Sequence, residues 1–324
     1  MCTAATYYSR DHYFGRNLDL EFSYNETVTI MPRGYKFPIR HADDLDSHYA
    51  LIGMAFVVDD YPLYYDAINE KGVGMAGLNF PTNAVYKELE SEKDNITPFE
   101  FIPWILGQAA SLDEARALVE KINLLNENFS EQLPLSPLHW MISDKTGSIV
   151  VEQTEEGLRI YDNPVGVMTN NPTFDIQLFE LNKYMSLSTE PAQNTFAPNI
   201  PLQQYSRGMG AIGLPGDLSS TSRFVKAAFT RMNSISGESE LESVSQFFHI
   251  LGSVDQQRGC VHLGGDKYEI TIYTSCCNLD KGIYYYNTYE NHQITAIDMH
   301  KTDLDGNKLT TYPLRHGENI FYES

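Results

Sequence analysis

The chain has little positive charge, little cysteine and no long apolar run. Its 324 residues include 23 Lys and Arg against 43 Asp and Glu, which gives a net charge of −20. A surface this acidic repels phosphate backbones and anionic membranes, so the composition argues against a nucleic-acid-binding protein. No segment approaches the roughly 20 apolar residues needed to cross a bilayer, so we expect no membrane insertion.

The beginning of the chain also does not have the pattern of a secretory signal peptide. The first twenty residues contain no apolar central region, and Arg10, Asp11, Arg16 and Asp19 interrupt them. The sequence therefore predicts a cytoplasmic protein.

The four cysteines form no recognisable metal-binding or disulfide pattern. They are Cys2, Cys260, Cys276 and Cys277, with no Cys-x-x-Cys pair and no histidine at ligand spacing. We expect free thiols in a reducing compartment, with Cys276 and Cys277 structural rather than zinc ligands. The nine histidines are scattered as well, so no metal or organic cofactor is predicted. Cys2 is the exception, because a chain terminus gives a cysteine no packing role.

The hydrophobic content is sufficient for a large core. Hydrophobic residues make up 42% of the chain and aromatic residues 12%, which argues against disorder. There is no repeat period, no low-complexity block and no linker rich in proline or glycine. A single domain over residues 1–324 is therefore predicted.

Residue patterns predict groups of strands separated by helices. Strand signals lie at 3–9, 14–20, 27–31, 49–60, 63–80 (a hairpin), 138–144, 148–162, 268–275, 281–289 and 292–300. Helical spacing is found at 98–110, 111–123, 174–185, within 213–232 and at 238–251. A capping box of Ser111 and Glu114 opens the second of these segments, and a serine cap precedes the helix within 213–232. This order fits two antiparallel sheets, each covered on its outer face by a helix pair, although other α+β layerings satisfy it too.

Cys2 acquires a chemical role if Met1 is removed, as expected when the next side chain is small. The residue then carries a thiol with an ordinary pKa of about 8.5 beside an α-amine with one of about 7.7–8.0. Because these values nearly match, the amine can take the thiol proton near neutral pH without a histidine. The alternative is that Met1 stays and that Cys2 has no catalytic role.

Arg16 and Asp19 stand on the strand expected to pair with the first one. A cation beside the Cys2 sulfur would favour the thiolate, and a carboxylate would orient the amine. The two residues are three apart, so a regular strand directs their side chains to opposite faces. We therefore expect a bulge or bend around Asn17 and Leu18 if both side chains are to reach Cys2.

Five blocks of sequence, spread in order over almost the whole chain, carry a family resemblance. They read MCTAATYYSRDHYFGRNLDLEF, NEKGVGMAGLNFP, SPLHWMISDKTGSIVVE, VGVMTNNPTFDIQ and GLPGDLSSTSRFVKAAF. They resemble the bile salt hydrolases, the choloylglycine hydrolase family within the N-terminal nucleophile hydrolases. The resemblance implies a four-layer αββα sandwich, which agrees with the predicted order of elements.

The resemblance also implies a catalytic set around Cys2, the nucleophile that methionine removal exposes. Arg16 and Asp19 match the family's arginine and aspartate in the block GRNLD. Arg16 would favour the thiolate, and Asp19 would hydrogen-bond the α-amine.

Two asparagines and a second arginine complete the implied set. Asn79 matches one oxyanion-binding asparagine, and one residue of the pair Asn170 and Asn171 matches the other. We assign Asn170, which lies 53 residues before Arg223, the separation expected in this family, with Asn171 as the alternative. Arg223 would belong to the catalytic charge network, because a cation in the first turn of a helix opposes the helix dipole and needs an anionic neighbour.

The implied reaction is hydrolysis of the amide that joins a bile acid to glycine or taurine, through a thioester on Cys2 and without a cofactor. An apolar wall would hold the steroid, and its predicted residues are Leu18, Phe56, Tyr65, Leu133, Leu135 and Leu138. The negative net charge cannot attract an anionic bile salt from a distance, so recognition must be local. The resemblance further implies a homotetramer.

Two other functions compete with this interpretation. Penicillin V acylases share most of the catalytic set but tend to carry a tyrosine where this chain has Asn79, so the block GLNF favours bile salts. A non-catalytic steroid-binding protein that keeps Met1 is the second alternative. The sequence does not distinguish a preference for taurine conjugates from one for glycine conjugates.

Overall fold

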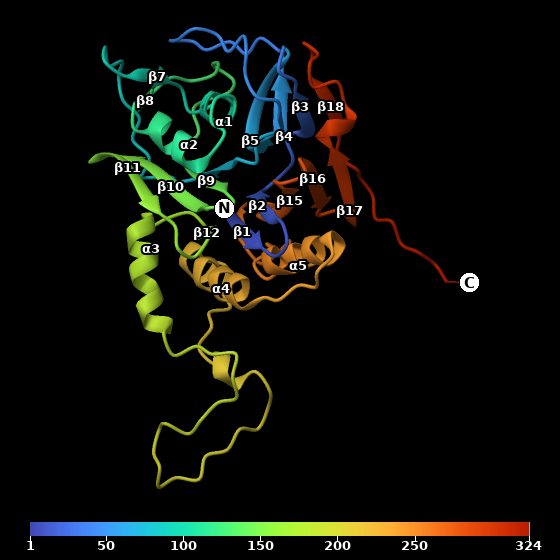
Figure 1. Cartoon of the computed structure of the whole chain (residues 1–324). Coiled ribbons are helices and arrows are strands. Elements are labelled where there is room, and N and C mark those ends of the chain that lie inside the picture. The colour runs from blue at the N-terminus through green and yellow to red at the C-terminus, as the bar shows by residue number, and fades with distance from the viewer. Residues whose placement is uncertain (324) are drawn as a thin grey trace.

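The beginning of the chain forms a strand inside the molecule, in the smaller of two stacked antiparallel sheets (Figure 1). The computed structural model describes residues 1–323. The smaller sheet has six strands, in the order β12 (Val167–Met168), β1 (Cys2–Tyr8), β2 (His12–Leu20), β15 (Ile270–Asn278), β16 (Ile283–Thr288) and β17 (Asn291–Asp298). Nearly every residue of β1 and β2 is buried, because both faces of this sheet are covered.

The larger sheet has eight strands and faces the smaller one. Their order is β11 (Gly157–Asp162), β10 (Gly147–Thr154), β9 (Leu138–Asp144), β6 (Gly74–Asn79), β5 (Tyr61–Asn69), β4 (Leu51–Val58), β3 (Thr27–Met31) and β18 (Thr310–Pro313). The predicted hairpin over 63–80 is the pair β5–β6. Its turn is set by local chemistry: the Asn69 side chain accepts from the Lys71 and Val73 amides, and Gly72 adopts a φ of 87°.

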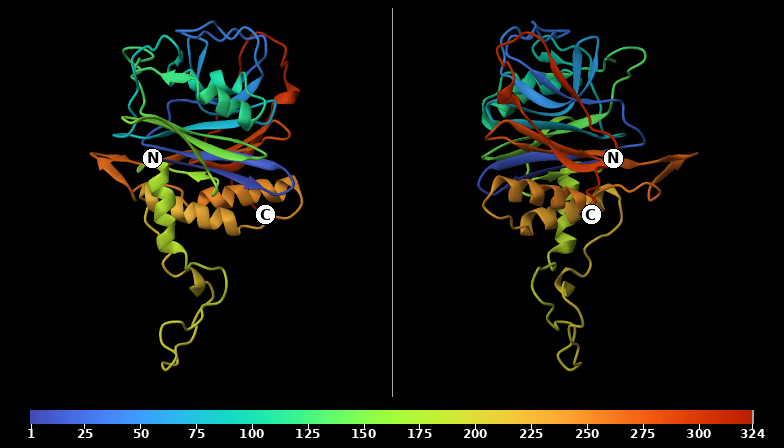
Figure 2. Two further views of the ribbon diagram at one scale, coloured as in Figure 1. Left: turned by 60° about the vertical axis from the view of Figure 1, so that its left-hand side comes forward. Right: turned by 90° about the vertical axis from the view of Figure 1, so that its right-hand side faces the viewer.

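Helices cover the outer face of each sheet (Figure 2). Helices α4 (Ser220–Asn233) and α5 (Glu240–Gly252) pack on the smaller sheet, and α1 (Phe101–Leu106) and α2 (Leu112–Val119) pack on the larger one. Helix α3 (Phe174–Glu180) packs beside α4. The predicted αββα sandwich is therefore confirmed, whereas the prediction of a single domain over 1–324 stays a prediction.

Several element boundaries differ from the sequence prediction. The two helices predicted over 98–123 are shorter, because the apolar residues Ile122 and Leu124 are buried in β8 (Ile122–Leu124), which pairs with β7 (Asp94–Ile96). The predicted helix over 174–185 is α-helical only to Glu180. Ser111 caps α2, but the Glu114 carboxylate accepts from the Ala110 amide and not from Ser111. The sequence did not indicate β7, β8, β12, β13 (His262–Gly264), β14 (Lys267–Tyr268) or β18, nor the 3-10 turns η1 (Leu181–Tyr184), η2 (Met209–Ala211) and η3 (Met299–Lys301).

Buried apolar side chains form two clusters that follow the layers. One cluster fills the space between the sheets and continues under α4 and α5, and it includes Cys2 and Phe14. The other lies between the larger sheet and α1 and α2, around Trp140. Cys276 and Cys277 are buried on β15, as expected of structural cysteines, and all four cysteines are free thiols. Residues 185–213 leave this body as an extended arm (Figures 1 and 2).

Candidate active site

Cys2 is the first residue of β1 and lies at the floor of a cavity. It pairs with Leu18 of β2 in a regular antiparallel register, and only 3% of its surface is exposed. Within the smaller sheet β1 lies between β2 and β12, and β12 pairs with Ala4 and Ala5. A chain start that would fray in most proteins is therefore held on both sides.

Arg16 of β2 contacts the Cys2 sulfur from the side of the larger sheet. Its Nη2 atom lies 2.6 Å from Cys2 Sγ, and its Nη1 atom donates to the Gly77 and Tyr65 carbonyls at 2.5 and 3.1 Å. Burial opposes the charge of Arg16, but the neighbouring Cys2, Tyr273 and Asp66 groups raise its pKa above the ordinary value. A fixed cation at this distance from sulfur favours the thiolate over the thiol.

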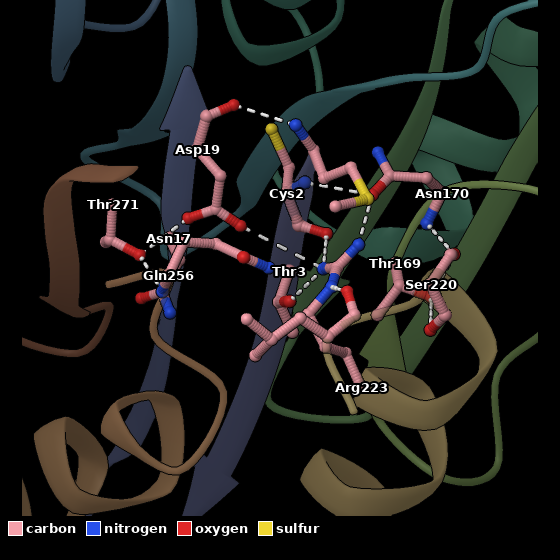
Figure 3. A network of polar contacts seen from close by, with 12 residues as sticks. Cys2, Thr3, Asn17, Asp19, Thr169, Asn170, Ser220, Arg223, Gln256 and Thr271 are labelled. Carbon is pink, nitrogen blue, oxygen red and sulfur yellow. Dashed lines mark hydrogen bonds and ion pairs between the residues drawn. The ribbon is translucent and has the colours of Figure 1, made fainter. Parts of the chain in front are cut away.

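Arg223 reaches the backbone of Cys2 from the opposite side (Figure 3). Its Nη1 atom donates to the Cys2 carbonyl at 2.6 Å and to Thr3 Oγ1 at 2.7 Å, and its Nη2 atom donates to Asn170 Oδ1 at 2.7 Å. The same Asn170 oxygen accepts from the Cys2 backbone nitrogen at 2.9 Å. Burial lowers the pKa of Arg223, and Asp19 and Cys2 counteract this shift. Arg223 and Asn170 thus fix the position of the Cys2 nitrogen.

Asp19 is fully buried and lies on the same side as Arg223. Its Oδ1 atom accepts from the Thr271 hydroxyl at 2.7 Å, and its Oδ2 atom lies 4.0 Å from Arg223 Nη1. Within the described residues Oδ2 has no hydrogen-bond partner. Burial raises the pKa of Asp19, and Arg223 is the strongest opposing charge.

The terminal ammonium of Met1 extends the same region. It donates to the Asp19 carbonyl at 2.8 Å and forms an ion pair with Glu269. Burial lowers its pKa below the ordinary value of 8.0. While Met1 is present, the Cys2 nitrogen is an amide and cannot act as a base.

The bulge predicted around Asn17 and Leu18 is absent from the pairing of β2 with β1, which keeps one register from His12 to Leu18. The pairing of β2 with β15 is irregular beside it, with an extra residue of β15 between Thr271 and Tyr273, which lie opposite Asp19 and Leu18. A bulge is unnecessary because Arg16 and Asp19 do not approach the same atom. Arg16 reaches the sulfur from one face of β2, and Asp19 lies near the start of the Cys2 backbone on the other face.

The two candidate oxyanion-binding asparagines lie next to each other. Asn79, at the end of β6, lines the cavity with Cys2, and its carbonyl accepts from Asn170 Nδ2 at 2.6 Å. Asn171 instead donates to the Pro81 carbonyl at 2.6 Å, on the exposed side of the segment. Of the pair that the sequence left open, Asn170 is therefore the one in contact with Cys2 and Arg223.

The cavity above Cys2 has a volume of about 390 Å³ and a mostly apolar lining. All six predicted wall residues line it: Leu18, Phe56, Tyr65, Leu133, Leu135 and Leu138. The sequence analysis missed further lining residues, which include Leu20, Tyr24, Leu63, Phe99 and Phe129. The rings of Phe99 and Phe129 meet edge to face at 5.2 Å, and no local pattern could have indicated this contact between separate loops. Among the described lining residues Arg16 carries the one fixed charge, and it lies against the Cys2 sulfur.

We expect the stability of the fold to depend on pH because of Asp255, which lies beside the candidate catalytic residues. Burial and the Asp19 charge raise its pKa to about 6, although Asn17 Nδ2 donates to it at 3.0 Å. Because the folded-state pKa lies above the unfolded one, ionisation of Asp255 destabilises the fold as the pH rises from about 4 to about 6. We expect Asp255→Asn to increase the free energy of unfolding at pH 7 by at most about 3 kcal/mol, the equivalent of two pKa units, and to change it little at pH 3.5. Urea unfolding at both pH values measures this, and equal stability of the two proteins at pH 7 would contradict it.

Sequence comparisons show the family. The profile of the linear amide C–N hydrolases of the choloylglycine hydrolase family matches residues 2–312. The chain belongs to this family. Comparison with solved structures finds the same fold in a mutant of the conjugated bile acid hydrolase of Clostridium perfringens. The two chains match with a TM-score of 0.92 and 42% identity over 100% of both.

Choloylglycine hydrolase relatives with assigned names are similar over nearly their full length. The chain is 59% identical to the bile salt hydrolase/transferase of Lactiplantibacillus plantarum, over 97% of both chains. It is 43% identical to the bile salt hydrolase/transferase of Clostridium perfringens, over 96% of both. A penicillin V acylase from Agrobacterium tumefaciens has a TM-score of 0.76 at 21% identity, over 97% of this chain and 92% of the other, which shows a shared fold alone.

Membership of the choloylglycine hydrolase family makes this chain an amide C–N hydrolase and confirms the family predicted from the sequence. Between residues 1 and 323 no three or more His, Cys, Asp and Glu side chains gather as metal ligands would. None of the helices in that range has the length and apolarity that a bilayer crossing requires.

Proposed function

We propose that this chain hydrolyses the amide bond between a bile acid and glycine or taurine, with Cys2 as the nucleophile once Met1 has been removed. The observation that carries the proposal is the 2.6 Å contact between Arg16 Nη2 and Cys2 Sγ at the floor of an apolar cavity. The names of the relatives at 59% and 43% identity supply the substrate class. The cavity wall would bury the steroid, each buried methylene contributing about 0.8 kcal/mol.

In the proposed first half-reaction the α-amine of Cys2 takes the thiol proton. The sulfur then forms a bond to the acyl carbon, and the carbonyl oxygen becomes an oxyanion. The side-chain amides of Asn79 and Asn170 are the proposed donors to that oxyanion, because each can donate without carrying a charge. The C–N bond then breaks, the leaving nitrogen takes the proton from the α-ammonium, and a thioester remains on Cys2.

In the proposed second half-reaction water releases the bile acid. The α-amine takes a proton from water, the hydroxide oxygen bonds to the thioester carbon, and the C–S bond breaks as the sulfur regains a proton. This cycle requires an amine held in one orientation. Asn170 Oδ1 already accepts from the Cys2 nitrogen, and the unpartnered Asp19 Oδ2 is the proposed acceptor for a further N–H of the freed amine. Arg223 would hold the Cys2 carbonyl and Asn170 in place.

Amino acid release tests the proposed function. The purified chain, with its intact mass recorded, is incubated with glycine and taurine conjugates of bile acids and separately with penicillin V. We expect a mass without Met1, ninhydrin-positive release of both amino acids, and slower cleavage of penicillin V. A processed chain that cleaves only penicillin V would instead be a penicillin V acylase, and an inert chain that binds bile salt and keeps Met1 would be the steroid-binding protein.

We further propose that the chain is a homotetramer and that the arm of residues 185–213 lies in the contact between copies. The arm carries large apolar side chains that are mostly exposed in the single chain, at 85% for Met185, 84% for Phe196 and 84% for Tyr205. Large apolar side chains exposed along one segment cost free energy in water and are typical of protein contacts. Every copy of the chain carries this arm, so we propose that the arm of one copy contacts a second copy.

The free thiols are compatible with the predicted cytoplasmic location.

Light scattering after size exclusion is expected to give about four times the chain mass of 36.7 kDa. The double variant Phe196→Ser with Tyr205→Ser should give a smaller assembly, because it removes apolar area from the arm. Leu89→Ser is the matched control, since Leu89 is 61% exposed but lies outside the arm. A wild-type monomer, or an arm variant of unchanged mass, would contradict the proposal.

A further inference from the structure

His139 and Glu152 form a fully buried pair outside the candidate catalytic set. They lie on the adjacent strands β9 and β10, and neither side chain has any exposed surface. His139 Nδ1 lies 3.0 Å from Glu152 Oε1, and His139 Nε2 lies 2.8 Å from the Thr169 carbonyl. A carbonyl oxygen can only accept, so Nε2 carries a hydrogen and donates it to Thr169.

The pair holds the segment that carries Asn170 at two points. Thr169, whose carbonyl His139 binds, directly precedes Asn170. The backbone nitrogen of Phe174 donates to both Glu152 carboxylate oxygens, at 3.1 and 3.3 Å. The loop between these two points is therefore tied to the larger sheet by one histidine and one glutamate.

The His139 ring also packs against the segment that carries Asn79. It stacks on the ring of Phe80, the residue after Asn79, with ring centres 4.2 Å apart and planes 4° from parallel. β9 pairs with β6 so that Leu138 lies opposite Asn79. The His139 side chain thus contacts the neighbours of both candidate oxyanion donors. The two donors, Asn79 and Asn170, are 91 residues apart, and Asn170 Nδ2 donates a hydrogen bond to the Asn79 carbonyl.

We propose that His139 is a positioning residue for the oxyanion site, which holds Asn170 relative to Asn79 and Cys2 through its Nε2–H···O bond to Thr169. Glu152 fixes the orientation of the ring, and Phe80 fixes its plane. The proposal rests on the proposed function, because it assumes that Asn79 and Asn170 stabilise the oxyanion. Oxyanion donors act only when they are already in place, and a displacement of about 1 Å can cost about a hundredfold in rate.

Two isosteric variants separate the two nitrogens of the ring. In His139→Gln the side-chain amide nitrogen can occupy the place of Nε2 and still donate to Thr169. In His139→Asn it can occupy the place of Nδ1 and contact Glu152, but it does not reach Thr169. Both variants lose the ring, its packing on Phe80 and its titration, so each serves as the control for the other.

We expect His139→Gln to keep kcat for conjugated bile salt within about fivefold of the wild type. His139→Asn should lower kcat by roughly ten- to a hundredfold, less than complete loss of one oxyanion donor, with KM unchanged. Rates are divided by the concentration of folded protein, measured from the amplitude of the thermal unfolding transition, so unfolded protein does not enter them. The rate at which iodoacetamide alkylates Cys2 should be equal in both variants, because no oxyanion forms in that reaction.

Equal kcat values in the two variants, or a parallel change in KM or in the alkylation rate, would overturn the proposal in favour of simple packing. If His139→Asn gives too little folded protein, Glu152→Asp replaces it: the shorter side chain withdraws the partner that orients the ring. A drop in kcat of at least fivefold at constant KM is then expected, and a wild-type kcat would overturn the proposal. If the wild-type chain releases no amino acid, it is the proposed function that fails, whereas an active wild type with indistinguishable variants refutes this inference alone.

Discussion

Cys2→Ala is expected to eliminate the release of glycine and taurine from conjugated bile salts. The variant has no sulfur to form the thioester, and removal of a catalytic nucleophile costs roughly 10⁶-fold in kcat in enzymes of comparable design. The fold should persist, because alanine fits a buried strand position at which Cys2 is 3% exposed. Initial rates of amino acid release, with the thermal unfolding temperature as the check on folding, measure the effect.

Cys260→Ser is the matched control for this change. Cys260 is an exposed free thiol, whereas Cys276 and Cys277 are buried in β15. The control should keep full activity and should still lose it on alkylation. A Cys2→Ala protein that releases amino acid at more than about one thousandth of the wild-type rate would show that another group performs the attack.

Arg16→Gln is expected to cause the second largest loss of activity. The substitution removes the guanidinium that lies 2.6 Å from Cys2 Sγ and leaves the sulfur without a fixed cation on the side of the larger sheet. We expect kcat/KM at pH 6 to fall by roughly 10²–10³-fold, the loss typical of one preorganised electrostatic partner. The pH midpoint of Cys2 alkylation by iodoacetamide should rise, because less thiolate is present at a given pH.

Arg16→Lys distinguishes charge from geometry at the same position. Lysine keeps the charge but cannot contact the sulfur and the Gly77 and Tyr65 carbonyls at once, so an intermediate loss is expected. Arg33→Gln is the remote control, since Arg33 binds Glu70 and Asp305 and does not line the cavity. An unchanged alkylation midpoint in Arg16→Gln would refute the assignment of Arg16 to the thiolate.

The parts of the fold that local chemistry specifies were predictable. The hairpin β5–β6 follows from two apolar runs around a turn of Asn69 and Gly72, and helix α5 follows from the helical spacing of its apolar residues. The predictions of secondary structure failed where pairing with a strand distant in the sequence outweighs the local spacing of apolar residues. Ile122 continues the helical spacing of α2 but lies in β8, because β7 offers it a strand partner. The sequence did not indicate β18, because its partner strand β3 lies at the other end of the chain.

The candidate site divides in the same way. Residue type and position alone suggested Cys2, Arg16 and Asp19 but left open whether Met1 stays, and it was the family resemblance that selected all three. The choice between Asn170 and Asn171 could not be made by counting. It depends on which side of the segment faces Cys2, and the bonds of Arg223 and Ser220 to Asn170 determine that.

The sequence by itself indicated the family and, through that resemblance, the layer order and the residue at which acylation is proposed, because the five matching blocks are local in the chain. Tertiary structure alone decided that Arg16 contacts the Cys2 sulfur while Asp19 lies near Arg223, and that aromatic residues of separate loops line the cavity. It also placed His139 against the neighbours of two asparagines that are 91 residues apart. The physical reason is that strand register fixes which distant side chains meet, and register is a property of the packed sheets rather than of any one segment.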